Sequence, residues 1–219
     1  MNDLSTPLVV GPPMRCFRPF HAALLTLALP LASLALASPS EAQAGPATRY
    51  LRERNDEVNE LLRRPASADR DAGVTRILSA LLDYEELARR SLGTHWDGRT
   101  PEQRTEFVSL LQQLVEQQYQ SNLERVLDYE ISYLSEGEIE GGRSVATEAR
   151  SRAARRQPPI AITYAVRRDG SAWRVVDVTT DGVSMVQNYQ QQFNRYITSD
   201  GWDGLIRRMR ERLARSSGG

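Results

Sequence analysis

The spacing of apolar residues changes twice along this chain, and those changes constrain the fold more than any other feature. Before residue 129 the apolar residues recur every three or four positions, which is typical of amphipathic helices. From Tyr129 to about Thr179 they alternate with polar residues, the period of a half-buried strand. After residue 186 the helical spacing returns. Helices on both sides of a block of strands predict an α+β domain.

Amphipathic helices are therefore expected in two blocks. The clearest boundary is the start of the helix at residue 101, where Thr100 can act as the N-cap and Pro101 fits the first turn. Gln103 lies three residues after that cap and can close a capping box. The apolar spacing places the helices at residues 51–62, 71–92, 101–128, 186–197 and 202–213.

Four strands are expected between the helical blocks. Gly141 and Gly142 indicate one turn, and the run from Arg168 to Ser171 indicates another. Because strands joined by short turns run antiparallel, the pattern predicts helices packed around a four-stranded antiparallel sheet. The alternation places the strands at residues 129–133, 145–149, 160–166 and 173–179.

The first 44 residues are predicted to be a secretory signal peptide and not part of the fold. Two arginines precede an uncharged apolar run at residues 22–37, and the small residues Ala42 and Ala44 suit a cleavage site. The apolar run is interrupted by Pro30 and is shorter than the ~20 residues that a transmembrane helix needs. We therefore expect export, cleavage near Ala44 and a single domain over residues 45–219.

Composition limits the chemistry available to the chain. Its 28 basic residues, all arginine, balance 28 acidic residues, which disfavours a nucleic-acid binder because such proteins need excess positive charge. The one cysteine precedes residue 45, so no disulfide or thiolate metal site is expected in the domain. His95 is the one histidine there, too few for a histidine zinc site. We expect no catalytic group, metal or cofactor.

Two groups of charged residues stand out. Asp83, Glu85 and Glu86 lie together on an expected helix and are predicted to form a solvated face. Arginines gather at residues 150–156, with two more at residues 167–168. This Arg-rich hairpin could meet an acidic partner or anionic lipid headgroups, or it could keep a sheet edge from pairing with other chains.

The apolar faces leave the interior of the domain open to two interpretations. Helices and sheet could pack into a solid core, or they could stand apart around an apolar pocket. Both arrangements need the same one-sided apolar residues, so the spacing does not separate them. Spacing alone favours the solid core, since that is the ordinary use of an amphipathic face.

Residues 173–213 resemble the C-terminal region of the MlaC family, also called the toluene-tolerance family, whose members are periplasmic phospholipid-binding proteins. The resemblance combines a strand beginning at Trp173, the DGVSM turn at residues 181–185, the Asn188-Tyr189 pair and Phe193. A second block, DYEELARRSLGTHWDGRTPEQRTEF at residues 83–107, is similar to the segment that leads into the family's long helix.

Membership of that family implies a mixed fold that encloses a hydrophobic pocket for phospholipid acyl chains, with the headgroup near solvent. It implies a non-enzymatic, monomeric periplasmic carrier that shuttles lipid to maintain outer-membrane lipid asymmetry. The implied partners are an inner-membrane ABC transporter complex with an MCE-domain subunit and an outer-membrane lipoprotein complex. This favours the pocket over the solid core.

We predict that the pocket is lined by bulky residues of the expected helices and strands. The run from Val183 to Met185 is expected to start a helix that gates the pocket. The predicted lipid-binding residues are Phe107, Leu111, Leu114, Ile131, Tyr133, Ile162, Tyr164, Val176, Val178, Met185, Val186 and Phe193.

Two hypotheses from other classes stay open at this point. One is an enzyme on a cone-like α+β fold that acts on a small apolar substrate, with His95 or Asp177 as the base. The other is an interaction module with a solid core. An empty interior without bound lipid would favour the second hypothesis over a carrier.

Overall fold

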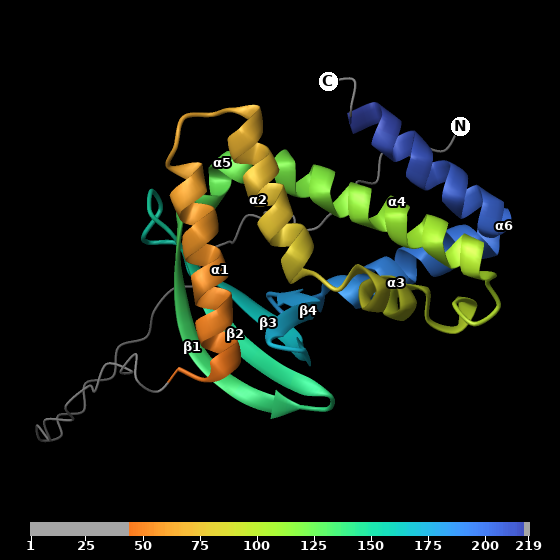
Figure 1. Cartoon of the computed structure of the whole chain (residues 1–219). Helices are drawn as coiled ribbons and strands as arrows, with labels where there is room; N and C mark the ends of the chain where they lie inside the picture. The colour runs from red at the N-terminus through yellow and green to blue at the C-terminus, as the bar shows by residue number, and fades with distance from the viewer. Residues whose placement is uncertain (1–43, 217–219) are drawn as a thin grey trace, which may run out of the picture.

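The computed structural model describes residues 44–216, so the expected signal peptide lies outside the described residues (Figure 1). Helices and strands follow the predicted order of helices, strands and helices, which confirms the α+β class. The helices before the sheet are α1 (Pro46–Leu62), α2 (Ala68–Leu81), α3 (Tyr84–Leu92), a 3-10 turn (Gly93–His95), α4 (Pro101–Gln120) and α5 (Leu123–Val126). Helix α6 (Met185–Ser216) ends the described chain and is broken at Gly201, where φ is 71°.

The sheet has five strands and not the four that the sequence predicted. All neighbours pair antiparallel in chain order, so the sheet is a simple meander. The additional strand has two residues that pair with Thr179 and Thr180, too few to produce a visible alternation. The strands are β1 (Tyr129–Ile139), β2 (Gly142–Ser151), β3 (Ile160–Asp169), β4 (Ala172–Thr180) and β5 (Val183–Ser184).

The single helix predicted over residues 71–92 is wrong, because the chain breaks between α2 and α3. Leu82 has extended dihedral angles and forms a parallel bridge with Val175 of β4. Asp83 then caps α3 by accepting a hydrogen bond from the Glu86 backbone N–H at 2.9 Å. Its other oxygen pairs with Arg167 at 2.6 Å. The acidic cluster expected to be a solvated face therefore includes a helix cap.

Helix α4 begins as predicted and ends earlier. The Thr100 hydroxyl accepts from the Gln103 backbone N–H, and the Gln103 side chain accepts from the Thr100 N–H, so the capping box is confirmed. The helix stops at Gln120, and the short helix α5 follows. Figure 1 shows α4 running from the helical side of the molecule to the edge of the sheet.

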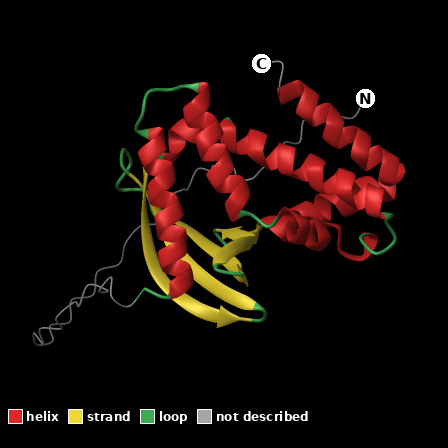
Figure 2. Ribbon diagram, viewed as in Figure 1, coloured by secondary structure: helices red, strands yellow, loops and turns green. Residues whose placement is uncertain are grey.

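The helices form two groups with different roles. Figure 2 shows α1 and α2 beside the sheet, with α3, α4 and α6 gathered at one end. The second group shares an apolar core in which Phe107 packs edge-on against Phe193, with ring centroids 5.2 Å apart. The Trp202 ring lies tilted against Phe107, with centroids 5.8 Å apart. In the first group, α1 packs against the sheet through one smaller cluster and against α2 and α5 through another.

Asp177, considered above as a possible base, fixes the corner between the sheet and α6. Its side chain is buried, and one oxygen accepts from the Ser184 hydroxyl at 2.6 Å. The other accepts from the backbone N–H groups of Val178 at 2.8 Å and Val186 at 3.1 Å. A buried carboxylate with three donors is well compensated, so Asp177 holds the start of α6 against β4.

We expect Asp177→Asn to destabilise the protein by about 2 kcal/mol, because the amide loses both the charge and one acceptor at this corner. Asp203→Asn, on the exposed surface of the same helix, should change the free energy of unfolding by less than about 0.5 kcal/mol. Urea unfolding of both variants measures the difference. Equal stabilities would contradict the role given to Asp177.

Candidate binding cavity

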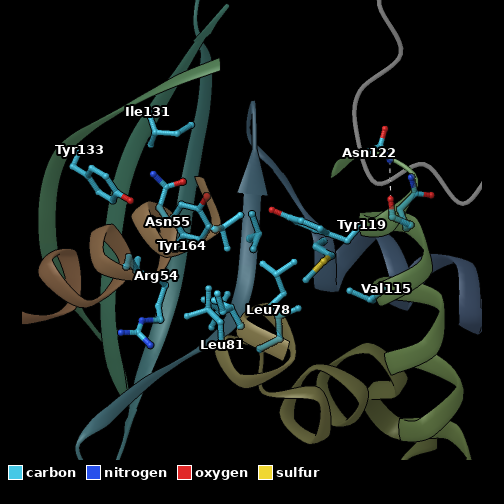
Figure 3. Close-up of a pocket in the computed structure, with 18 of the residues that line it drawn as sticks. Arg54, Asn55, Leu78, Leu81, Val115, Tyr119, Asn122, Ile131, Tyr133 and Tyr164 are labelled. Atoms are coloured by element: carbon cyan, nitrogen blue, oxygen red, sulfur yellow. Dashed lines mark hydrogen bonds between the residues drawn. The ribbon is translucent and has the colours of Figure 1, made fainter. Parts of the chain in front are cut away.

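A partly enclosed cavity of about 380 Å³ lies between the sheet and the helices α1, α2, α4 and α6 (Figure 3). That volume falls within the ~300–1,000 Å³ usual for small-molecule pockets. Aliphatic and aromatic side chains make most of its wall. The lining residues are Leu51, Arg54, Asn55, Val58, Ile77, Leu78, Leu81, Leu82, Val115, Gln118, Tyr119, Asn122, Ile131, Tyr133, Tyr164, Val175, Val178, Met185 and Tyr189.

Helix α1 covers one side of the cavity and is held by packing near both of its ends. Near its start, Ala47 and Leu51 join a buried cluster with the sheet residues Val145, Val166 and Trp173. Near its end, the helix packs on α2 and α5 in a separate cluster. The turn between those clusters contributes Arg54 and Asn55 to the cavity wall, beside Leu51 and Val58 from the clusters themselves.

A bulge in β4 places two valines of the same strand in the wall. The register shift pairs Ala165 with Asp177 but Val166 with Val175, so Val176 is the additional residue. An additional residue reverses the alternation of side chains beyond it. Val175 and Val178, three positions apart, therefore both line the cavity.

The charge in the wall comes from one side chain among the described lining residues, Arg54. Its side chain is about one-third exposed at 32%, which places the guanidinium between the cavity and solvent. It pairs with Glu57 at 2.6 Å and lies over the Tyr50 ring at 5.3 Å. This arrangement provides a cation at the rim while the interior of the cavity stays uncharged.

Four tyrosines in the wall are held in their neutral form. Burial is the main cause in each case: it raises the pKa of Tyr119 and of Tyr189 to about 12, and it raises the pKa of Tyr133 and Tyr164 above the ordinary value. Tyr119 and Tyr133 both lie near Tyr164. Electrostatic repulsion from the Tyr164 phenolate therefore raises the pKa of each of them further.

The structure brings together five of the twelve predicted lining residues. These are Ile131, Tyr133, Tyr164, Val178 and Met185. Met185 is the first residue of α6, whereas Val183 and Ser184, expected to start that helix, form strand β5.

The other seven predicted residues lie outside this lining. Five of them pack in the solid core of α3, α4 and α6, because that half of α4 faces α6 and not the sheet: Phe107, Leu111, Leu114, Val186 and Phe193. Val176 is displaced by the bulge, and Ile162 of β3 is partly buried away from the cavity wall.

The sequence did not predict that α1, α2 and the end of α4 contribute residues to the cavity wall. Their apolar spacing was visible, for example at Leu51, Val58, Ile77 and Leu78, but nothing in it separates a helix that covers a cavity from one that covers a core. The polar residues Asn55, Gln118 and Asn122 gave no signal at all.

The groups considered for catalysis are used elsewhere. His95 shares a hydrogen bond of 2.9 Å between Nε2 and the Asn194 side chain, and neither His95 nor Asp177 lines the cavity. Within residues 44–216, no group of three acidic, histidine or cysteine side chains is arranged to hold a metal ion. No helix in that part of the chain is long and apolar enough to span a membrane.

The fold and the cavity together define an α+β protein with an apolar binding chamber between its sheet and its helices. Residues 52–211 match the family model described as MlaC protein. The chain belongs to the MlaC family, and the resemblance seen in its sequence is confirmed.

Two similar proteins have names that describe phospholipid binding. The chain is 25% identical over 142 residues to the intermembrane phospholipid transport system binding protein MlaC of Haemophilus influenzae, a match that covers 63% of this chain and 66% of that protein, just under two thirds. It is similar in fold, with a TM-score of 0.67 and 20% identity, to the phospholipid-binding protein from Ralstonia solanacearum, solved in complex with a phospholipid. That match covers 78% of this chain and 98% of the solved one.

We expect stability to fall in alkali as the wall tyrosines ionise. Each has a higher pKa in the folded state than the ~10 of an unfolded chain, so its contribution is full below pH 10 and is lost as pH rises toward about 12. Urea unfolding between pH 8 and pH 11 measures the loss, which should be smaller in Tyr119→Phe. An absorbance titration in which all the tyrosines of the folded protein ionise near pH 10 would contradict this.

Proposed function

We propose that this protein is a phospholipid carrier that holds acyl chains in the cavity between its sheet and its helices. The observation that carries the proposal is the cavity of about 380 Å³ with a largely aliphatic wall, in a chain of the MlaC family. The names of the Haemophilus influenzae relative and of the Ralstonia solanacearum structure support the same ligand class.

The physical reason for such a cavity is the cost of exposing a lipid to water. Each methylene removed from water contributes ~0.8 kcal/mol, so an acyl chain of about fifteen methylenes contributes on the order of 12 kcal/mol. An apolar cavity provides that free energy of binding to an acyl chain without strong polar contacts. A carrier that depends mainly on apolar burial can release its lipid to any equally apolar acceptor.

The wall suggests how the lipid lies. Ile131, Val178 and Met185 provide apolar contact for the chains, opposite Leu78 of α2. The partly exposed guanidinium of Arg54 provides a place for the phosphate at the rim, where the headgroup keeps its contact with water. The lipid-binding contacts that we propose are therefore those of the cavity wall.

The cellular setting completes the proposal. We infer a periplasmic monomer, consistent with the signal-peptide pattern in the sequence, whose residues 45–219 form one lipid-binding domain. Its partners are the inner-membrane ABC transporter complex with its MCE-domain subunit and the outer-membrane lipoprotein complex. Shuttling between these complexes maintains the lipid asymmetry of the outer membrane.

We expect Val178→Asp to reduce the lipid that co-purifies with the protein by about tenfold, because it places a carboxylate among acyl chains. Val183→Asp is the matched control: it makes the same change at a valine that is 59% exposed, and it should keep the wild-type load. Organic extraction followed by mass spectrometry measures the load.

The milder variant Val178→Thr controls for a folding defect, since it replaces one methyl group with a hydroxyl and keeps nearly the same shape. Its load should lie between those of the wild type and Val178→Asp, at unchanged helical circular dichroism. Wild-type protein that carries no lipid after gentle purification, and takes up none from phospholipid vesicles, would refute the carrier function.

A further inference from the structure

Four polar groups from separate parts of the fold lie near one another inside the largely apolar cavity. They are the hydroxyls of Tyr119 in α4, Tyr133 in β1 and Tyr164 in β3, and the side-chain amide of Asn55 in α1. Figure 3 shows Tyr119 and Tyr133 pointing from opposite sides toward Tyr164 and Asn55. Two helix positions and two strand positions that are distant in sequence therefore bring their polar groups to one region of the cavity.

Within residues 44–216, these four side chains have no hydrogen-bond partner in the protein. Buried donors are nearly always paired with protein or ordered water. The Tyr84 hydroxyl is different, because it is sealed from solvent beside Ser79 and lies outside this lining. The three wall tyrosines and Asn55 are instead only partly buried, and all four line the cavity.

The free groups define the chemistry of a complementary ligand atom. Phenol hydroxyls at neutral pH are uncharged donors, and burial raises the pKa of the wall tyrosines further from neutrality. An uncharged acceptor suits them best, since it loses little hydration when it enters an apolar space. In a glycerolipid such acceptors are the ester carbonyl oxygens, which lie where the acyl chains begin.

We propose that Tyr119, Tyr133, Tyr164 and Asn55 form a subsite for the ester carbonyl groups of a glycerolipid. The inference rests on the proposed carrier function and adds to it a selection for ester-linked over ether-linked chains. The phosphate, which is charged, stays with Arg54 at the rim. The aliphatic wall provides most of the affinity, and the subsite fixes how far the chains enter.

The test compares two lipids that differ in those carbonyl groups alone. Delipidated full-length mature protein is mixed with vesicles of a diacyl phosphatidylglycerol or of the dialkyl ether analogue with the same chains, and the loaded fraction is measured by mass spectrometry. The wild type should prefer the ester lipid by roughly tenfold, the effect of one or two buried hydrogen bonds. Tyr164→Phe should reduce that preference, and the combined Tyr119→Phe, Tyr133→Phe and Tyr164→Phe variant should lose it.

Tyr84→Phe is the matched control, because it removes a hydroxyl that is sealed and lies outside the cavity lining, and it should keep the preference. A wild type that loads both lipids equally would overturn the subsite and leave the carrier function intact. A Tyr164→Phe variant with the full wild-type preference would also overturn it. A wild type that loads neither lipid would refute the carrier function itself.

Discussion

The structure depends on how helix α1 is held against the sheet. Ala47 and Leu51 fix its start in a cluster with the strands, and Val58 and Leu62 fix its end in a cluster with α2. Close packing normally fills the space under such a helix. Here the two clusters fix the two ends of α1, and the cavity lies beside the helix turn between them. The other features of the site depend on this position of the helix.

Some apolar residues of the protein form a packed core, and others line the cavity. The helices α3, α4 and α6 share a core of buried apolar residues around Phe107 and Phe193. Helix α4 connects the two regions, since its first half belongs to that core while Tyr119 near its end lines the cavity. A solid region of this kind supports a hollow one, because the unfilled wall loses contacts that a packed core would make.

Polar groups are a minority in the cavity wall, and the proposed pose uses two kinds of them. In that proposal the partly exposed Arg54 meets the charged phosphate, and the phenols meet uncharged acceptors of the lipid. Aliphatic burial is non-directional and provides affinity without specifying a pose. Hydrogen-bonding groups are directional, so a small number of them is enough to orient a ligand that the wall already holds.

The sequence by itself determined the α+β class, the capping box at Thr100, the antiparallel sheet and the MlaC family, because each has a local signature in residue spacing or motif. The tertiary structure alone decided the break at Leu82, the bulge at Val176 and the short strand β5. It also decided which apolar faces surround space. The physical reason is that a side chain turned toward a cavity and one turned toward a core obey the same periodicity, and they differ only in what stands opposite.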